Sequence, residues 1–459
     1  MNDEAQVLAR AAELAADWVA SAPERPIPAR ATVAELRKTL GGALPEGPTP
    51  DREVVESLAR DAEPGLTSMG SGRYFGFVIG GTLPSALAAD WLVSAWDQNA
   101  GLLLPTPAAA VIEETAGRWV RELLGLPDAA SFAFVTGCQM AHTTALAVAR
   151  DTVLDRAGWS VGERGLQGGP ALRIVAGDKR HVTVDRALRL LGVGADQVRL
   201  VPCDGQGRML AGLLPGVLAE ADGPTIVCAQ AGEVNTGSFD DFPAVADACE
   251  AAGAWLHVDG AFGLWAGTSP RFRQLVAGVE RADSWATDAH KWLNVPYDCG
   301  IAFCADPAAH RRSMSATASY LVQVDESEGR EPLAYGPEFS RRARSVPVYA
   351  AIRSLGRSGV TELVERCCDH ARAFAGRIAG LPGCEVLNDV VLNQVLFRFV
   401  DDATTTRALA AVQDGGEAWM SGTTWDGRPA IRLSVSSWRT TEEDVERTVA
   451  VFERALRRG

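Results

Sequence analysis

The chain has 459 residues, of which 47% are hydrophobic, and a formal net charge of −14 at pH 7. A chain of this length can form two domains and bury a large core without disulfides or structural metal ions. Its acidic balance disfavours nucleic acid and anionic membranes as partners, because both repel a negatively charged surface. We therefore expect a globular protein that binds neither.

The nine cysteines are scattered and form no CxxC pair, so we expect neither a metal site nor a disulfide framework. An odd number of thiols fits a reducing compartment. The first residues include Asp3, Glu4 and Glu13 and lack a basic region leading into an apolar core, unlike a secretory signal. The sequence has no uninterrupted apolar stretch of about 18 residues. A cytoplasmic location is the expectation.

Residues 1–65 predict short helices separated by the proline-rich joints PERPIPA and PEGPTPD. Residues 4–19 place Val7, Leu8, Leu14 and Val19 near one face, which is typical of an amphipathic helix. So short a segment with an apolar face must pack on another surface. That surface could belong to the same chain or to a partner subunit, and we predict the partner subunit.

The stretch RYFGFVIGG at residues 73–81 has two interpretations. It is either a buried strand with a turn or a pocket wall in which Tyr74, Phe75 and Phe77 offer flat apolar surfaces. Residues 83–99 and 107–124 then predict helices, the second with Pro107 near its start and Gly125 after its end.

Between residues 130 and 305, short apolar runs alternate with helix-length stretches, which is typical of a mainly parallel sheet with crossover helices. The runs are SFAFVT, LRIVAGD, VRLVP, TIVCAQA, AWLHVD, SWATD and GIAFC. Ligands bind such sheets at the carboxyl ends of the strands. The residues at or after those ends are Gly137, His181, Asn235, Asp259 and the neighbourhood of Lys291.

We expect a large domain over residues 66–344 and a small α+β domain over residues 345–459, where short strand-like runs and helices interleave. Residues 313–340 are polar, charged and without clear periodicity. Long loops of this kind are usually functional, so we interpret this one as a lid.

Lys291 is one of three lysines in the chain and stands between His290 and Trp292, after a run that ends in Asp259. The structural interpretations are a lysine whose head reaches water and an aspartate that caps a turn. An amine in apolar surroundings and a strand-end carboxylate are also what pyridoxal 5′-phosphate (PLP) requires, for its aldehyde and its pyridine nitrogen. As a Schiff-base lysine, Lys291 is expected to have a lowered pKa.

Three further positions carry weaker signals. Gly137, Cys138 and Gln139 follow a strand and open a helix, a junction whose free N–H groups suit a phosphate. His181 is either a surface or capping residue or an imidazole that stacks on the ring and moves protons. His142, one turn further along the same helix as Cys138, is interpreted as structural.

At these residues the chain resembles the group II PLP-dependent amino-acid decarboxylases, over roughly residues 65–455. The most specific matches are HVD-x-A at His257–Ala261 and DS-x5-HKW at Asp283–Trp292. The resemblance implies the aspartate-aminotransferase-like fold (fold type I), an α/β architecture with helices on both faces of a mainly parallel sheet. It also implies PLP as the cofactor and a homodimer whose active site lies at the subunit interface.

The resemblance assigns roles residue by residue. Lys291 binds the cofactor aldehyde, Asp259 pairs with the pyridine nitrogen, and Ala261 and His181 lie against the two faces of the ring. The phosphate falls to Gly137, Cys138, Gln139 and His290, and Asn235 lies in the cofactor-side loop. Asp288 stands where relatives often carry a neutral polar residue, so we expect its carboxylate to point away or to cap a turn.

The implied reaction is decarboxylation of an L-amino acid to an amine, with Tyr335, Tyr320 or His181 as the proton donor. Tyr74, Phe77 and Trp96 favour an aromatic substrate, whereas Arg73 or Arg344 leaves an acidic one open. The alternatives are an aldehyde synthase, a carbon–carbon lyase or an aminotransferase on the same fold, and a non-catalytic cofactor-binding protein.

Overall fold

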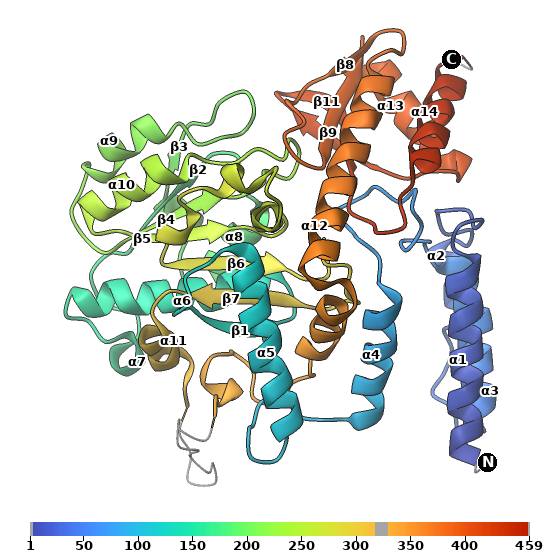
Figure 1. The fold of residues 1–459 in the computed structure, drawn as a ribbon, viewed down its shortest axis with the longest axis horizontal. Coiled ribbons are helices and arrows are strands. Elements are labelled where there is room, and N and C mark those ends of the chain that lie inside the picture. Colours follow the sequence, from blue (N-terminus) through green and yellow to red (C-terminus); the bar gives the residue numbers. More distant parts are fainter. Residues whose placement is uncertain (1–2, 317–328, 458–459) are drawn as a thin grey trace.

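A computed structural model describes residues 3–316 and 329–457 and contains a central sheet of seven strands (Figure 1). Its spatial order is β1-β7-β6-β5-β4-β2-β3. The strands are β1 (Ser131–Val135), β2 (Arg173–Gly177), β3 (Val198–Val201), β4 (Thr225–Gln230), β5 (Trp255–Asp259), β6 (Ser284–Asp288) and β7 (Gly300–Cys304). Only β7 runs antiparallel to its neighbours, β1 and β6. Each apolar run predicted from the sequence contains one of these strands, which confirms the mainly parallel sheet.

Helices cover both faces of the sheet because its strands alternate between two apolar cores. Ile226 and Cys228 of β4 belong to the core under α6 (Cys138–Arg156) and α8 (Val182–Leu190). Val227, between them, belongs to the opposite core. That second core includes residues of α5 (Pro107–Leu124) and α10 (Phe242–Ala252). The expected fold class is confirmed. The remaining helices of this region are α4 (Pro84–Trp96), α7 (Val161–Arg164), α9 (Leu214–Leu218) and α11 (Pro307–Met314).

A second, antiparallel sheet of four strands forms the C-terminal part in the order β10-β11-β9-β8. Its strands are β8 (Cys384–Val386), β9 (Gln394–Phe399), β10 (Ser421–Trp425) and β11 (Arg428–Ser434), with helices α13 (Asp402–Gly415) and α14 (Glu442–Arg457). The long helix α12 (Ser345–Ile378), kinked at Gly356, packs on α5 of the large sheet's layer and on α14. The expected boundary at residue 345 falls at the start of α12, and the domain division stays a prediction.

The N-terminal helices stand at one side of the molecule, α1 beside α3 (Figure 1). They are α1 (Asp3–Ser21), α2 (Val33–Thr39) and α3 (Asp51–Ala62), and none of them contains a buried residue. Leu8 is 61% exposed and Leu58 59% exposed. Of the apolar face predicted for residues 4–19, Leu8 is exposed, while Val7, Leu14 and Val19 are partly buried, so the face is only partly covered in the single chain.

Short 3₁₀ turns complete the chain, and one of them corrects the predicted lid. They are η1 (Glu63–Gly65), η2 (Ala195–Gln197), η3 (Ala211–Leu213), η4 (Gly263–Thr268), η5 (Arg273–Val276), η6 (Val279–Arg281) and η7 (Pro332–Ala334). All residues of η7 are buried, and the N–H of Leu333 donates to the carbonyl of Gly101. The 329–340 part of the predicted lid is thus largely packed, because apolar residues anchor it. Tyr320 lies outside the described residues.

Among the described helices, none combines the length and the apolar character needed to cross a membrane.

Candidate active site

The carboxyl ends of β5 and β6 and the turn after β1 bring the predicted site residues together. Asp259 is the last residue of β5, Asp288 is the last residue of β6, and Lys291 follows three positions later. The Lys291 Nζ atom lies 3.1 Å from Asp288 Oδ2. A charged amine and two buried carboxylates therefore share one edge of the sheet.

The carboxylate of Asp259 is held ionised by its neighbours. Burial would raise its pKa, but His142, His181 and Lys291 together hold that pKa well below the usual range. The N–H of Ala261 donates to Asp259 Oδ1 at 3.1 Å, and His142 Nε2 lies 3.4 Å from the same oxygen. An aspartate in this state can pair with a protonated ring nitrogen.

His142 is a site residue that the sequence interpretation missed. It is fully buried on α6, and its Nδ1 lies 2.9 Å from Nε2 of His257 on β5. The available signal was its spacing, since residues four apart lie on one helix face and Cys138 opens α6. His142 therefore contacts the Asp259 carboxylate in addition to packing in the core.

The turn before α6 corrects the expectation for Asp288. The backbone N–H of Cys138 donates to Asp288 Oδ1 at 2.6 Å, and the Asp288 side chain is 3% exposed. The carboxylate points into the site because a helix N-terminus and the Lys291 ammonium both attract it. A Cβ atom on Gly300 would lie 2.3 Å from the Gly137 carbonyl carbon, so only glycine lets β7 approach this turn.

The environment of Lys291 also differs from the expectation. Burial lowers the pKa of its amine, but Asp288, Cys138 and Asp259 raise it by a larger amount, so the pKa of Lys291 is raised overall. The sequence-based expectation of a lowered pKa is wrong for this arrangement of side chains. The physical reason is the ion pair with Asp288, which the sequence interpretation did not include.

Two histidines flank the site. His181 caps the N-terminus of α8, with its Nδ1 accepting the N–H of Thr183 at 3.3 Å, and burial lowers its pKa. The Nδ1 atom of His290 accepts the N–H of Cys299 at 3.1 Å, and burial lowers its pKa too. The ring of His290 lies 4.3 Å from that of Tyr297, a residue that sequence reasoning missed.

Aromatic side chains form a wall near Lys291. The rings of Tyr74 and Trp419 stack at 5.1 Å, and Phe77 lies 5.5 Å from Trp419. A Cβ atom on Gly80 of the same loop would lie 2.0 Å from the Lys291 carbonyl oxygen. Phe77 itself has a positive φ of 55°, a strained conformation often found at functional sites. The loop 73–81 is thus a surface beside Lys291, with Trp419 as a partner from the small domain.

Trp96, predicted to line the substrate pocket, lies elsewhere in this chain. It is 48% exposed at the end of α4 and lines a separate hollow of about 320 Å³ with Val93, Ile112 and Val346. Helix α4 ends at Trp96, where Asp97 adopts a left-handed conformation.

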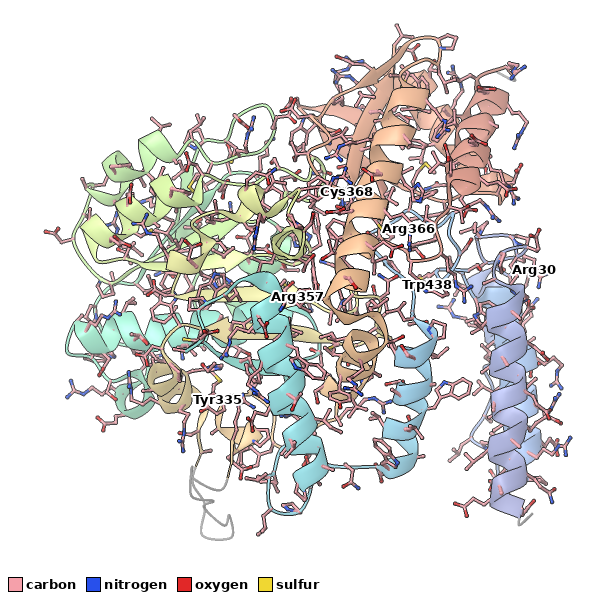
Figure 2. The ribbon with its side chains drawn as sticks, viewed as in Figure 1. Arg30, Tyr335, Arg357, Arg366, Cys368 and Trp438 are labelled. Carbon is pink, nitrogen blue, oxygen red and sulfur yellow. The ribbon has the colours of Figure 1, made fainter. Side chains whose placement is uncertain are left out.

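Tyr335 lies beside α11 (Figure 2). Its ring lies 5.3 Å from the ring of His310 on α11, and the Arg330 guanidinium lies 4.1 Å from it. His310 Nδ1 in turn lies 2.8 Å from the Ser131 hydroxyl at the first residue of β1. Tyr335 is therefore near the amino end of β1, whereas Gly137 follows its carboxyl end. These contacts hold the ring away from the Lys291 site of its own chain, and the role of Tyr335 as proton donor at a site between subunits stays a prediction.

The side chain of Asn235, which was expected beside the cofactor, forms hydrogen bonds with other protein side chains. Its amide donates to Glu233 Oε1 at 2.8 Å, and its Oδ1 accepts from the Thr423 hydroxyl at 3.0 Å. Its role at the cofactor stays a prediction.

The two arginines that left an acidic substrate open are both paired. Arg73 is 4% exposed and donates to the carbonyls of Pro23 and Glu417, with Asp444 3.2 Å away. Arg344 lies 2.8 Å from Asp298 and 3.5 Å from Glu338. Their charges are already balanced within the chain.

Comparison with known proteins agrees with this geometry. The sequence profile described as the pyridoxal-dependent decarboxylase conserved domain matches residues 34–400. The chain belongs to this family. An aromatic-L-amino-acid decarboxylase of Bacillus atrophaeus is 27% identical over 95% of this chain and 92% of the relative. An L-2,4-diaminobutyrate decarboxylase of Rhizobium meliloti is 28% identical over 79% of this chain and 73% of the relative. The crystal structure of an Oryza sativa TDC with PLP and tryptamine has a TM-score of 0.93 at 24% identity, covering 100% of this chain and 98% of that one.

The donor set of this PLP-dependent decarboxylase fits its cofactor. Lys291 supplies an amine for the aldehyde, and Asp259 supplies an ionised carboxylate for the pyridine nitrogen. The turn at Gly137 and the start of α6 are the expected place for the phosphate, and the Lys291 ammonium, 3.1 Å from Asp288, offsets the charge of that carboxylate. The individual roles stay predictions.

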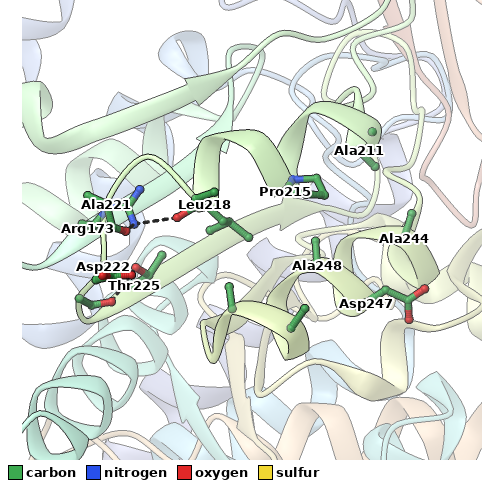
Figure 3. Close-up of a pocket in the computed structure, with 15 residues that line it drawn as sticks. Arg173, Ala211, Pro215, Leu218, Ala221, Asp222, Thr225, Ala244, Asp247 and Ala248 are labelled. Atoms are coloured by element: carbon green, nitrogen blue, oxygen red, sulfur yellow. Dashed lines mark hydrogen bonds between the residues drawn. The ribbon is translucent and has the colours of Figure 1, made fainter.

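A larger hollow in the decarboxylase lies away from this site (Figure 3). It measures about 690 Å³ and lies between α9 and α10, near the amino end of β4. Its lining is mostly alanine, glycine, leucine and proline, and Arg173 there donates to the carbonyl of Leu218. Neither lysine nor histidine lines it. Concavity alone would therefore have indicated the wrong place.

Proposed function

We propose that this PLP-dependent amino-acid decarboxylase acts on an aromatic L-amino acid and releases the amine and carbon dioxide. The observation that carries the proposal is the wall that Tyr74 and Phe77 form with Trp419, on a loop whose Gly80 packs against the backbone of Lys291. Family membership and the two relatives named for aromatic amines or amino acids support it.

In this proposal each side chain has one task. When bound, PLP supplies an electron sink for the electrons released as the substrate carboxylate leaves. Lys291 binds the cofactor aldehyde, and Asp259 keeps the ring nitrogen protonated. His181, with its pKa lowered by burial, is a neutral imidazole at physiological pH and serves as the ring's packing partner. Cys138, Gln139 and His290 bind the phosphate.

An aromatic side chain fits better than an acidic one because of the charges present. Arg73 and Arg344 already form ion pairs, so neither is left to recognise a distal carboxylate. Stacking between aromatic rings adds about 0.5–1.5 kcal/mol beyond the burial of apolar area. We therefore infer that Trp419 and Phe77 select a flat ring.

The test is carbon dioxide release from a panel of L-tryptophan, L-tyrosine, L-phenylalanine, L-glutamate and L-2,4-diaminobutyrate. We expect turnover of at least one aromatic substrate, and Trp419→Leu should raise its KM about tenfold while leaving folding intact. Lys291→Ala is the inactive control and should also lack the visible absorbance of the PLP-loaded protein. Preference for glutamate or diaminobutyrate would refute the aromatic proposal, and full turnover by Lys291→Ala would refute the role of the lysine.

The position of Tyr335 favours one alternative outcome. If no tyrosine hydroxyl reaches the substrate carbon, protonation depends on His181, and an aldehyde is the competing product under oxygen. Measuring amine, aldehyde and ammonia in the same assay separates a decarboxylase from an aldehyde synthase. Aldehyde as the main product would favour the alternative.

We further propose that the protein is a homodimer. Helices α1 and α3 expose leucines on a segment that contains no buried residue in any of its helices. The double variant Leu8→Glu/Leu58→Glu should dissociate in size-exclusion chromatography with light scattering, whereas Val400→Glu, at a side chain 74% exposed on the small domain, should not. A monomeric wild-type protein would refute the proposal.

A cytoplasmic location completes the proposal. All nine cysteines are free thiols, which is typical of a reducing compartment. Fractionation of the native host with an antibody to the chain would test it, and recovery outside the cytoplasm would refute it.

A further inference from the structure

A line of buried polar side chains runs through the large domain and ends at Asp259. The indole Nε1 of Trp255 donates to the Ser284 hydroxyl at 2.9 Å, and that hydroxyl lies 2.9 Å from His257 Nδ1. His257 Nε2 lies 2.9 Å from His142 Nδ1. His142 Nε2 lies 3.4 Å from Asp259 Oδ1. Neither imidazole is exposed at all, and both would be costly there without hydrogen-bonding partners.

The hydrogens along this line can be assigned from its two ends. The indole of Trp255 only donates and the ionised carboxylate of Asp259 only accepts, so with one hydrogen on each imidazole the Ser284 hydroxyl accepts from Trp255 and donates to His257 Nδ1. His257 then carries its hydrogen on Nε2 and donates to His142 Nδ1. His142 in turn carries its hydrogen on Nε2, the nitrogen that faces Asp259. Each group before Asp259 donates once along the line, and each group after Trp255 accepts once along it.

The ionisation of His257 agrees with this assignment. Burial lowers the pKa of His257 to about 3, so its ring is neutral near pH 7 and has one hydrogen to place. The rings of His142 and His257 meet edge to face at 83°, which keeps the Nε2–Nδ1 contact between them. Nothing in the line needs a second proton.

We propose that Ser284, His257 and His142 are positioning residues that deliver one N–H to Asp259 and thereby fix the oxygen presented to the pyridine nitrogen. Among the described residues, the bonds to the carboxylate converge on Oδ1: the Ala261 N–H, His142 Nε2 and the Cys138 thiol at 3.9 Å. Oδ2 is then the oxygen for the ring nitrogen. This inference rests on the proposed cofactor role of Asp259.

The same atoms suggest a rival arrangement. Cys138 Sγ, His142 Nε2 and Asp259 Oδ1 lie close enough to form three ligands of a metal ion, with Sγ 3.4 Å from Nε2. A metal ion would need the lone pair of Nε2. The hydrogen-bonded line from Trp255 to Asp259, called the relay from here on, places a hydrogen on that nitrogen instead. The two arrangements therefore exclude each other.

The relay is tested first in the wild-type protein. The chain has six histidines, so selective ¹⁵N labelling gives a small set of imidazole signals. We expect His142 and His257 to be neutral at pH 7 with the hydrogen on Nε2, assigned with His142→Gln and His257→Gln. Hydrogen on Nδ1 of either ring, or a doubly protonated His142, would overturn the proposal. One equivalent of zinc in the purified protein that is lost in Cys138→Ala would also overturn it.

Cofactor affinity gives a second readout that does not depend on turnover. His142→Leu removes the N–H and should raise the PLP dissociation constant about ten- to hundredfold, the effect of a hydrogen bond to a charged group. His142→Gln places an amide N–H near the position of Nε2 and should restore most of the affinity. Equal losses in the two variants would overturn the relay, since a merely structural role gives glutamine no advantage.

A matched control exists at the other end of the sheet. His310 is also buried beside a serine, with Nδ1 2.8 Å from the Ser131 hydroxyl. His310→Leu should lower the thermal midpoint without changing the PLP dissociation constant. Asp259→Asn distinguishes a failure of the proposed cofactor role of Asp259 from a failure of the relay alone. If this variant keeps full PLP affinity, the cofactor role of Asp259 fails. If it loses affinity while His142→Leu does not, only the relay fails.

Discussion

Replacing Asp288 by asparagine should change how readily the site takes up PLP. The carboxylate lies 3.1 Å from the Lys291 amine, with side chains 3% and 20% exposed, so water screens this pair weakly. Asparagine keeps an oxygen to accept the Cys138 N–H but removes the charge. The ammonium then loses its main partner, and the pKa of Lys291 falls. Only the neutral amine reacts with an aldehyde, so uptake should become faster.

The magnitude follows from the burial of the pair. Removing one partner of a buried ion pair costs about 3–5 kcal/mol, and the retained hydrogen bond reduces this to about 2–3 kcal/mol. Because about 1.4 kcal/mol corresponds to a factor of ten, the neutral fraction of Lys291 at pH 7 should rise at least tenfold. The variant also removes a negative charge from the proposed phosphate turn, so PLP should bind more tightly.

The assay is the growth of visible absorbance after saturating PLP is added to apoprotein between pH 6 and pH 9. Wild type should respond slowly at low pH, and Asp288→Asn should respond at least ten times faster at pH 7. Asp402→Asn is the control, because its pair with Arg428 has side chains 51% and 42% exposed. Identical pH profiles for wild type and Asp288→Asn would refute the interpretation that Asp288 holds Lys291 protonated.

Three further predictions concern packing, acid stability and the product. Gly300→Ala should destabilise the protein by at least about 2 kcal/mol in urea unfolding, because the added Cβ would overlap Gly137. The control, Gly376→Ala, lies in the open interior of α12 and should stabilise the protein by about 0.5–1 kcal/mol. Equal effects of the two substitutions would contradict this reasoning. Burial lowers the pKa of both His257 and His310 to about 3, against 6.5 for an ordinary histidine. The unfolded chain therefore binds more protons between these values, and the free energy of unfolding should fall by about 1.4 kcal/mol per pH unit and ring from pH 6 toward pH 3; a flat profile would argue against neutral buried rings. Tyr335→Phe should leave the amine-to-aldehyde ratio unchanged, and a shift toward aldehyde would mean that this tyrosine reaches a partner's site.

The parts of the molecule that depend on local pattern could be predicted from the sequence. Apolar runs bounded by turns became the strands of the large sheet, because a strand buried on both faces must be continuously apolar. Helix α5 begins at Pro107 and is capped by Gly125, as the proline and glycine positions indicated. The HVD and HKW contexts pointed to the cofactor that the family match supports.

The misplaced residues failed for different physical reasons. Tyr335 was assigned from its place in a polar loop, but Arg330 and His310 hold its ring at the far end of β1. Trp96 was grouped with other aromatic residues by type alone, but it lines a separate hollow at the end of α4. In both cases the prediction rested on sequence proximity or residue type, neither of which fixes the direction in which a side chain points.

The sequence by itself therefore determined which reactive groups the chain supplies: one lysine with apolar neighbours, one strand-end aspartate and a mainly parallel sheet that holds them. Tertiary structure decided which groups surround that pair. His142 against Asp259 and Trp419 against Tyr74 are contacts between separate elements, and the ion pair of Asp288 with Lys291 depends on how the turn after β6 is folded. The pairing of Tyr74 with Trp419 joins residues far apart in the chain. Such contacts set charge and selectivity, and they arise only when packing fixes the direction of each side chain.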